Sequence, residues 1–207
     1  MIHTYRISIT LLWITLLTIA HTSAQEFEIK NGNATFDIQG TKVPDSILSV
    51  VSCSAAAWSH YITTNTPIRV SVSWQELKSN VNAYAKPTNY YAINSVYYPC
   101  ALAEKIQGKN LNGTNADIEV VINKNINWHL DPETTPNEGT YDLTTTLIHE
   151  FAHGLGLIGN ITSDCLGNSN FATPAICDMF VCDSVVQPIV HKDVNSYSIK
   201  SELLTSQ

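Results

Sequence analysis

The chain has 207 residues, of which 44% are hydrophobic and 14% are charged, and its formal net charge is −7. This apolar content is enough for one globular domain with its own core, which excludes a disordered or repetitive chain. An acidic surface repels the phosphate backbone of nucleic acid, and no cluster of lysine and arginine offers a local exception. We therefore expect no nucleic-acid partner.

The first 24 residues predict a secretory signal peptide. Arg6 precedes the apolar run 7–20, and small residues then lead to a cleavage site after Ala24. The run is shorter than the roughly 20 apolar residues that a spanning helix requires, so it does not predict a membrane anchor. We expect a secreted domain over residues 25–207, extracellular or periplasmic. Export also makes the five cysteines candidates for disulfide bonds, with at least one left unpaired.

The first half of the mature chain predicts a hairpin, a helix and a strand. Residues 25–42 are polar with turn signals, which is typical of an edge hairpin or a short pro-region. Apolar residues then recur at helical spacing from Ile47 to Ile62, with Asp45 as the predicted N-cap. Ile68 to Trp74 alternates strictly between apolar and polar residues, which predicts a strand buried on one face.

The second half predicts a loop, a helix and another strand. Residues 76–95 are polar and rich in turn formers, so we expect a loop there. Ala101 to Gln107 predicts a helix that Gly108 ends. Ala116 to Asn123 predicts a second strand, with alternate apolar residues on one side.

The stretch from Thr144 to Gly159 contains the motif H-E-x-x-H, at His149, Glu150 and His153. On a helix, two histidines four residues apart point the same way and can hold one zinc ion. The carboxylate between them can act as general base towards the metal-bound water. We predict a helix that Asp142 caps and that glycines end, at Gly154 and Gly156. An ordinary core helix with two partnered histidines is the alternative.

The residues around this motif resemble the H-E-x-x-H-G-L-G-F centre of a group of secreted, mostly bacterial, zincin-type metalloproteases. H-E-F-A-H-G-L-G-L from His149 carries the resemblance, together with Y-Y-P-C-A-L-A-E-K from Tyr97 and G-T-Y-D-L from Gly139. It covers most of residues 43–207. The resemblance implies an α+β zincin-like catalytic domain, with a twisted mixed sheet packed on the active-site helix. It also implies Zn²⁺ as cofactor and a cleft edged by a strand, a role we assign to residues 116–123.

The third zinc ligand has no clear position in this sequence. The metzincin pattern H-E-x-x-H-x-x-G-x-x-H places its third histidine at Gly159, which has no side chain to offer. Asp178 and Asp164 are the local candidates, and Asp178 is preferred because of its apolar flanks. His129 fits a solvated loop histidine better than a ligand. Because members of the family run on beyond the point matching Gln207, we also expect an incomplete product whose third ligand lies in a missing C-terminal segment.

Three functions follow from these residues. The first is a secreted zinc endopeptidase that acts on a peptide or protein substrate, with His149 and His153 as ligands and Glu150 as base. The second is a zinc hydrolase of another amide, which would use the same residues. The third is an inactive binding or surface module that keeps the zincin scaffold. Metal content separates the third function from the other two.

Overall fold

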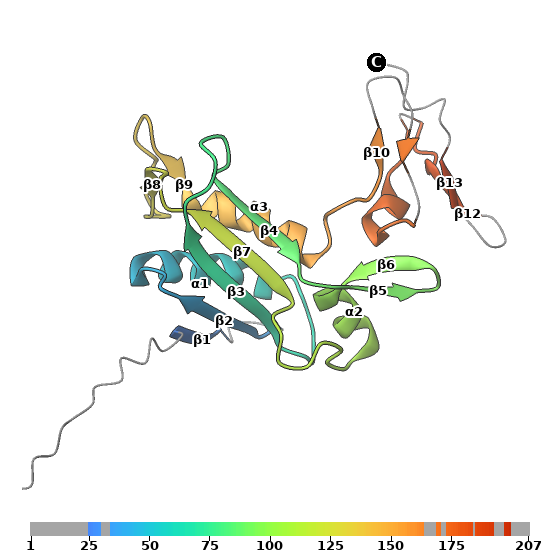
Figure 1. Ribbon diagram of the computed structural model, residues 1–207, viewed down its shortest axis with the longest axis horizontal. Helices are drawn as coiled ribbons and strands as arrows, with labels where there is room; N and C mark the ends of the chain where they lie inside the picture. The colour runs from blue at the N-terminus through green and yellow to red at the C-terminus, as the bar shows by residue number, and fades with distance from the viewer. Residues whose placement is uncertain are drawn as a thin grey trace, which may run out of the picture.

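A computed structural model describes residues 25–29, 34–163, 169–170, 173–183, 185–192 and 197–199. Its centre is a five-stranded mixed sheet (Figure 1) whose strands in spatial order are β1 (Gln25–Ile29), β2 (Phe36–Thr41), β3 (Ile68–Gln75), β7 (Ile118–Asn123) and β4 (Ala83–Pro87). The three inner strands are parallel, while β1 and β4 run antiparallel at the two edges. The predicted strands over residues 68–74 and 116–123 are thus direct neighbours.

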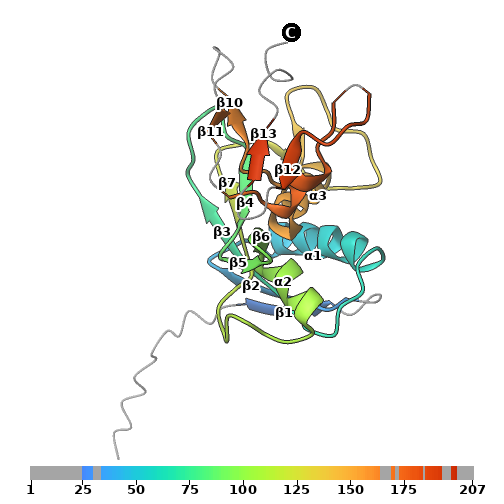
Figure 2. The same cartoon turned by 90° about the vertical axis from the view of Figure 1, so that its right-hand side faces the viewer.

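Two helices cover one side of the sheet, as Figure 2 shows. They are α1 (Asp45–Ser59) and α3 (Leu143–Leu155). The apolar stripe of α3 is buried against the sheet, because Leu143, Leu147 and Phe151 have no exposed surface. Phe151 also meets Phe36 of β2 edge to face, with ring centroids 6.0 Å apart. The predicted mixed α+β architecture, with a sheet packed on the histidine-bearing helix, is confirmed.

Three residues near the ends of α3 determine where the helix begins, where it ends and how closely it packs on the sheet. Asp142 caps the helix as predicted, since its side chain accepts hydrogen bonds from the backbone N–H groups of Thr144 and Thr145. Gly156, with φ of 127°, ends the helix. Gly154 does not end it: it lies inside the helix, where a Cβ would collide with Ile118 of β7. This glycine lets the histidine-bearing helix approach the sheet closely.

Two sequence predictions about the sheet are wrong. Residues 76–95 are not a loop, because they contain β4 and also β5 (Tyr90–Ile93), which forms a hairpin with β6 (Val96–Pro99). Residues 116–123 do not form an edge strand, because β7 has β3 on one side and β4 on the other. Both errors concern β4, which pairs with β7 and takes the edge position. Its sequence, A-Y-A-K-P, lacks the regular alternation of apolar and polar residues that predicts a strand.

The remaining elements are short. The helix α2 (Cys100–Gln107) follows β6 and ends at Gly108, as predicted. The small strands β8 (Trp128–His129) and β9 (Tyr141–Asp142) pair just before α3. Beyond α3 lie two small hairpins and a 3₁₀ helix, in the order β10 (Thr162–Ser163), β11 (Ser169–Asn170), η1 (Ile176–Phe180), β12 (Val190–Lys192) and β13 (Tyr197–Ile199).

Two further sequence predictions concern the N-terminal part. Asp45 is the first residue of α1 and not its N-cap, a position that Pro44 occupies. The hairpin expected over residues 25–42 is present as β1 and β2. The predicted signal peptide, residues 1–24, lies outside the described residues. No helix in the described part of the chain is long and apolar enough to cross a membrane.

Candidate metal centre

The two histidines of the motif aim at one point. Nε2 of His149 lies 2.9 Å from Nε2 of His153, and the rings are perpendicular with centroids 4.5 Å apart. His149 is exposed and His153 is half-buried, so the point between them is open to solvent. Two ring nitrogens at this separation can both lie within the roughly 2.0–2.1 Å that a zinc–nitrogen bond requires. We call His149 and His153 the histidine pair.

A backbone carbonyl fixes the orientation of His153. Nδ1 of this ring lies 2.8 Å from the carbonyl oxygen of Leu157, which can only accept a hydrogen bond. Nδ1 therefore carries the proton, and the lone pair of the ring is on Nε2, the atom that faces His149. Metal-binding histidines commonly have such a partner on the other ring nitrogen, because it sets both tautomer and ring direction.

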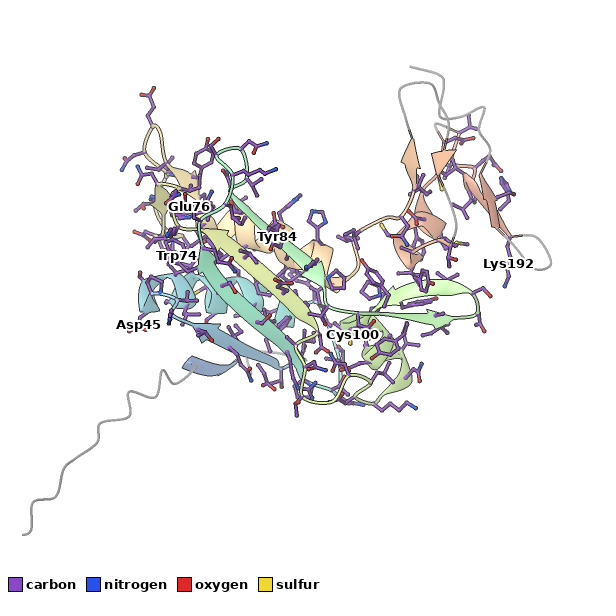
Figure 3. All side chains as sticks on the ribbon, in the orientation of Figure 1. Asp45, Trp74, Glu76, Tyr84, Cys100 and Lys192 are labelled. Atoms are coloured by element: carbon purple, nitrogen blue, oxygen red, sulfur yellow. The ribbon has the colours of Figure 1, made fainter. Side chains whose placement is uncertain are left out.

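Glu150 is held by the edge of the sheet. Its Oε2 accepts a hydrogen bond of 2.8 Å from the backbone N–H of Ala85, on β4. The labelled Tyr84 in Figure 3 marks this part of β4, beside α3. Because β4 pairs with β7 on its other side, the N–H of Ala85 points away from the sheet and would otherwise lack a partner within it. The bond uses one carboxylate oxygen and leaves Oε1 for other chemistry.

Asp178, the preferred local candidate for a third ligand, is engaged elsewhere. Its side chain is buried, and its oxygens accept hydrogen bonds from the backbone N–H groups of Asn160 at 2.9 Å and Ala175 at 2.8 Å. It also lies against Gly159, where a Cβ would collide with its carboxylate. Asp178 thus ties the segment after α3 to η1. Asp164 lies outside the described residues.

No third ligand joins the histidine pair among the described residues. There, the one group of three or more histidine, cysteine or acidic side chains with ligand atoms within 4.8 Å of one another lies elsewhere in the fold. His129 is bonded within its own loop, with Nε2 3.0 Å from the carbonyl oxygen of Thr134. The histidine pair and Glu150 are therefore the described part of the centre.

The cysteines form no disulfide among the residues described here. Cys53, Cys100, Cys177 and Cys182 are free thiols. The expectation of disulfides is not met by these four, and Cys165 lies outside the described residues. Cys177 and Cys182 also form no group with other ligand-type side chains in the described structure, so no thiolate metal site is found at these two cysteines.

A second cluster of ligand-type side chains is buried at the start of α2, where Figure 3 labels Cys100. The Sγ atom of Cys100 lies 3.2 Å from Oδ1 of Asp117 and 3.8 Å from Oε1 of Glu104. These three residues, the acid–thiol cluster, could hold a cation. Their acceptors are already occupied, since Glu104 accepts from the N–H of Leu111 at 2.7 Å and Asp117 from that of Arg69 at 2.8 Å. Hydrogen bonding therefore accounts for the cluster.

Burial changes the acidity of the acid–thiol cluster. It raises the pKa of the Asp117 carboxyl above its usual range. Burial, together with the neighbouring Asp117, also raises the pKa of the Cys100 thiol strongly. Burial thus disfavours the charged form of both groups, which lie in a site closed to solvent. Such a thiol is a poor nucleophile and a poor metal ligand at neutral pH.

Comparisons with protein-family models, with curated proteins and with solved structures found no match. The interpretation of the centre therefore rests on its own geometry. Two main-chain groups of the centre were not predicted from the sequence: the backbone N–H of Ala85, which binds Glu150, and the carbonyl of Leu157, which binds His153. Neither leaves a signal in residue types, because both act through the main chain. The glycine at position 156 is the one hint, since it marks where the chain turns back towards His153.

Proposed function

We propose that this protein is a zinc-dependent hydrolase of peptide bonds, of the zincin type. The convergence of the two Nε2 atoms, 2.9 Å apart on an exposed face of α3, supports the proposal most directly. The residues fit a zinc ion, because zinc prefers imidazole nitrogens and the tautomer of His153 presents a lone pair to it. His149 and His153 would hold the ion. Zinc bound there supplies a Lewis acid and a water of lowered pKa.

Glu150 is the general base in this proposal. It follows His149 directly in α3, and a carboxylate beside the first histidine can reach a metal-bound water, although its oxygens do not lie within 4.8 Å of both histidines. The hydrogen bond from Ala85 fixes Oε2, and Oε1 then accepts the proton of the attacking water. Orientation of the base before reaction lowers the entropic cost of the proton transfer.

The edge strand β4 is the proposed guide for the substrate. It is the outermost strand on the side of the sheet next to α3, and its outer main-chain groups face away from β7. An extended peptide can pair with such an edge, which aligns its backbone without regard to side chains. The proposal thus transfers to β4 the role that sequence analysis gave to residues 116–123.

The test replaces Glu150 and measures casein cleavage together with zinc content. Glu150→Ala should lose about 100-fold or more in rate, as expected on removal of a general base, and should keep its zinc. Glu133→Gln, in an exposed loop, is the matched control and should cleave like the parent protein. If Glu150→Ala cleaves casein as fast as the parent, the proposed mechanism is wrong.

A second candidate is a scaffold that binds without hydrolysis. It is favoured by the finding that two, and not three, protein ligands converge among the described residues, whereas a catalytic zinc site uses three. Protein that purifies without stoichiometric zinc, and does not gain casein cleavage when zinc is added, would support this candidate over the hydrolase.

A further inference from the structure

An apolar pocket of about 440 Å³ lies beside the C-terminal end of α3. It is bordered by the C-terminal end of α1, by α2, by the last turns of α3 and by η1, with walls that include Trp58, Ile62, Leu102, Leu155 and Phe180. Neither His149 nor His153 lines it. Its volume is within the range of pockets that hold small molecules, about 300–1,000 Å³.

The mouth of this apolar pocket exposes large hydrophobic side chains. Tyr61 is 86% exposed, Phe180 is 76% exposed and Leu157 is 60% exposed, and all three line the pocket. Single exposed apolar residues are ordinary, but several around one concave site mark a place where a ligand removes apolar surface from water. The pocket is therefore accessible from solvent, and an apolar chain bound there would remove its exposed apolar surface from water.

Lys105 is the one charged residue among the described residues that line the apolar pocket. This residue is exposed in the last turn of α2 and takes part in none of the salt bridges found among the described residues. A neutral ligand that covered the ammonium group would leave it without a partner and would remove part of its hydration. A ligand with an apolar chain and an anionic group can pack its chain against the apolar walls and pair its charge with the ammonium group of Lys105.

We propose that the apolar pocket binds an amphiphile with one aliphatic chain and one carboxylate, a medium-chain fatty acid in chemical class, whose head pairs with Lys105. The inference goes beyond the proposed hydrolase and does not depend on it. The one cation and the limited volume of about 440 Å³ favour a small amphiphile over a protein partner, which would need a wide surface with several contacts. Leu157 belongs to both sites, because its carbonyl orients His153 and the residue also lines the pocket.

Calorimetric titration with decanoate tests the proposal, and decanol serves as the neutral probe. The parent should bind decanoate, and Lys105→Gln should bind it about tenfold more weakly, the equivalent of 1.4 kcal/mol, because the positive charge that pairs with the carboxylate is lost. Binding of decanol should be the same in both proteins. Lys109→Gln is the matched control: it removes a nearby exposed lysine that does not line the pocket, and should bind decanoate like the parent.

A second measurement locates the ligand without any substitution. Cys177 lines the apolar pocket, while Cys53 is an exposed thiol of α1 that does not. Decanoate should slow the alkylation of Cys177 by iodoacetamide and leave that of Cys53 unchanged, as measured by peptide mass spectrometry. Equal labelling of Cys177 with and without decanoate, or equal decanoate affinity in Lys105→Gln and the parent, would overturn the proposal. Glu150→Ala should bind decanoate normally, so the pocket and the hydrolase are tested separately.

Discussion

Nδ1 of His153 and the carbonyl oxygen of Leu157 lie 2.8 Å apart, and this bond joins the helix α3 to the segment that follows it. The carbonyl can reach back because Gly156 has φ of 127°, a backbone conformation that L side chains rarely adopt. The backbone N–H of Leu157 is also held, by the carbonyl of Ala152 at 2.9 Å. The end of α3 thus sets the direction of a proposed metal ligand.

Gly156→Ala should therefore weaken zinc binding without touching either histidine. A methyl group at this φ forces the backbone to shift, and the Leu157 carbonyl moves with it. We expect zinc affinity to fall about 10- to 100-fold, the usual cost of losing such a partner, as measured by competition with a chromogenic chelator. Gly108→Ala, also at positive φ, with no atom within 4 Å of the added Cβ, should lose some stability and keep its zinc affinity.

Ala85→Pro should lower the catalytic rate through Glu150. Proline removes the N–H that Oε2 accepts, and because this N–H points away from β7 the ladder between the two strands survives. We expect the rate of casein cleavage to fall roughly tenfold or more, because the carboxylate of Glu150 loses its fixed orientation. Zinc content should stay unchanged, because neither histidine is altered. Ala85→Gly, which keeps the backbone N–H that Glu150 accepts, is the control and should cleave casein at close to the rate of the parent. Equal rates in both variants would show that the bond to Ala85 does not position the base.

A histidine at position 159 should not complete the metal centre. The position is filled by the Asp178 carboxylate, which would collide with any Cβ there. Gly159→His should lower the free energy of unfolding by roughly 1–3 kcal/mol, the usual range for overpacking, and should not raise zinc affinity. Urea denaturation and chelator competition measure the two effects. A rise in zinc affinity would mean that this segment can rearrange to bring a third imidazole to the pair.

The thiol of Cys100 should be inert in the folded protein. Burial and the neighbouring Asp117 raise its pKa, so at pH 8 it stays protonated, whereas an unperturbed thiol titrates near 9.0. Since the thiolate is the reactive form, iodoacetamide at pH 8 should modify Cys53 and leave Cys100 unmodified. Both should react in 6 M guanidinium chloride, where the burial is lost. Modification of native Cys100 at the rate of Cys53 would contradict the buried cluster.

The sequence by itself determined the histidine-bearing helix. The apolar spacing from Leu143 to Phe151 and the cap at Asp142 are local features, and the helix that they predicted is present with the cap in place. The convergence of His149 and His153 follows from their spacing, because residues four apart lie on one face of any α-helix. The strand from Ile68 was equally predictable, since its alternation matches the pleat of a sheet.

Only the tertiary structure decided which strand edges the site and what surrounds the helix end. Ala83–Pro87 is a strand because it pairs with β7, with Ala85 opposite Val120, and not because of its own residues. Asp178 resembles an ordinary loop aspartate in the sequence. In the structure its side chain is buried and accepts a hydrogen bond from the backbone N–H of Asn160, 18 residues away. These contacts join groups that are distant in the chain. Main-chain donors and acceptors are the same in every residue type but proline, so no sequence pattern predicts which of them will meet.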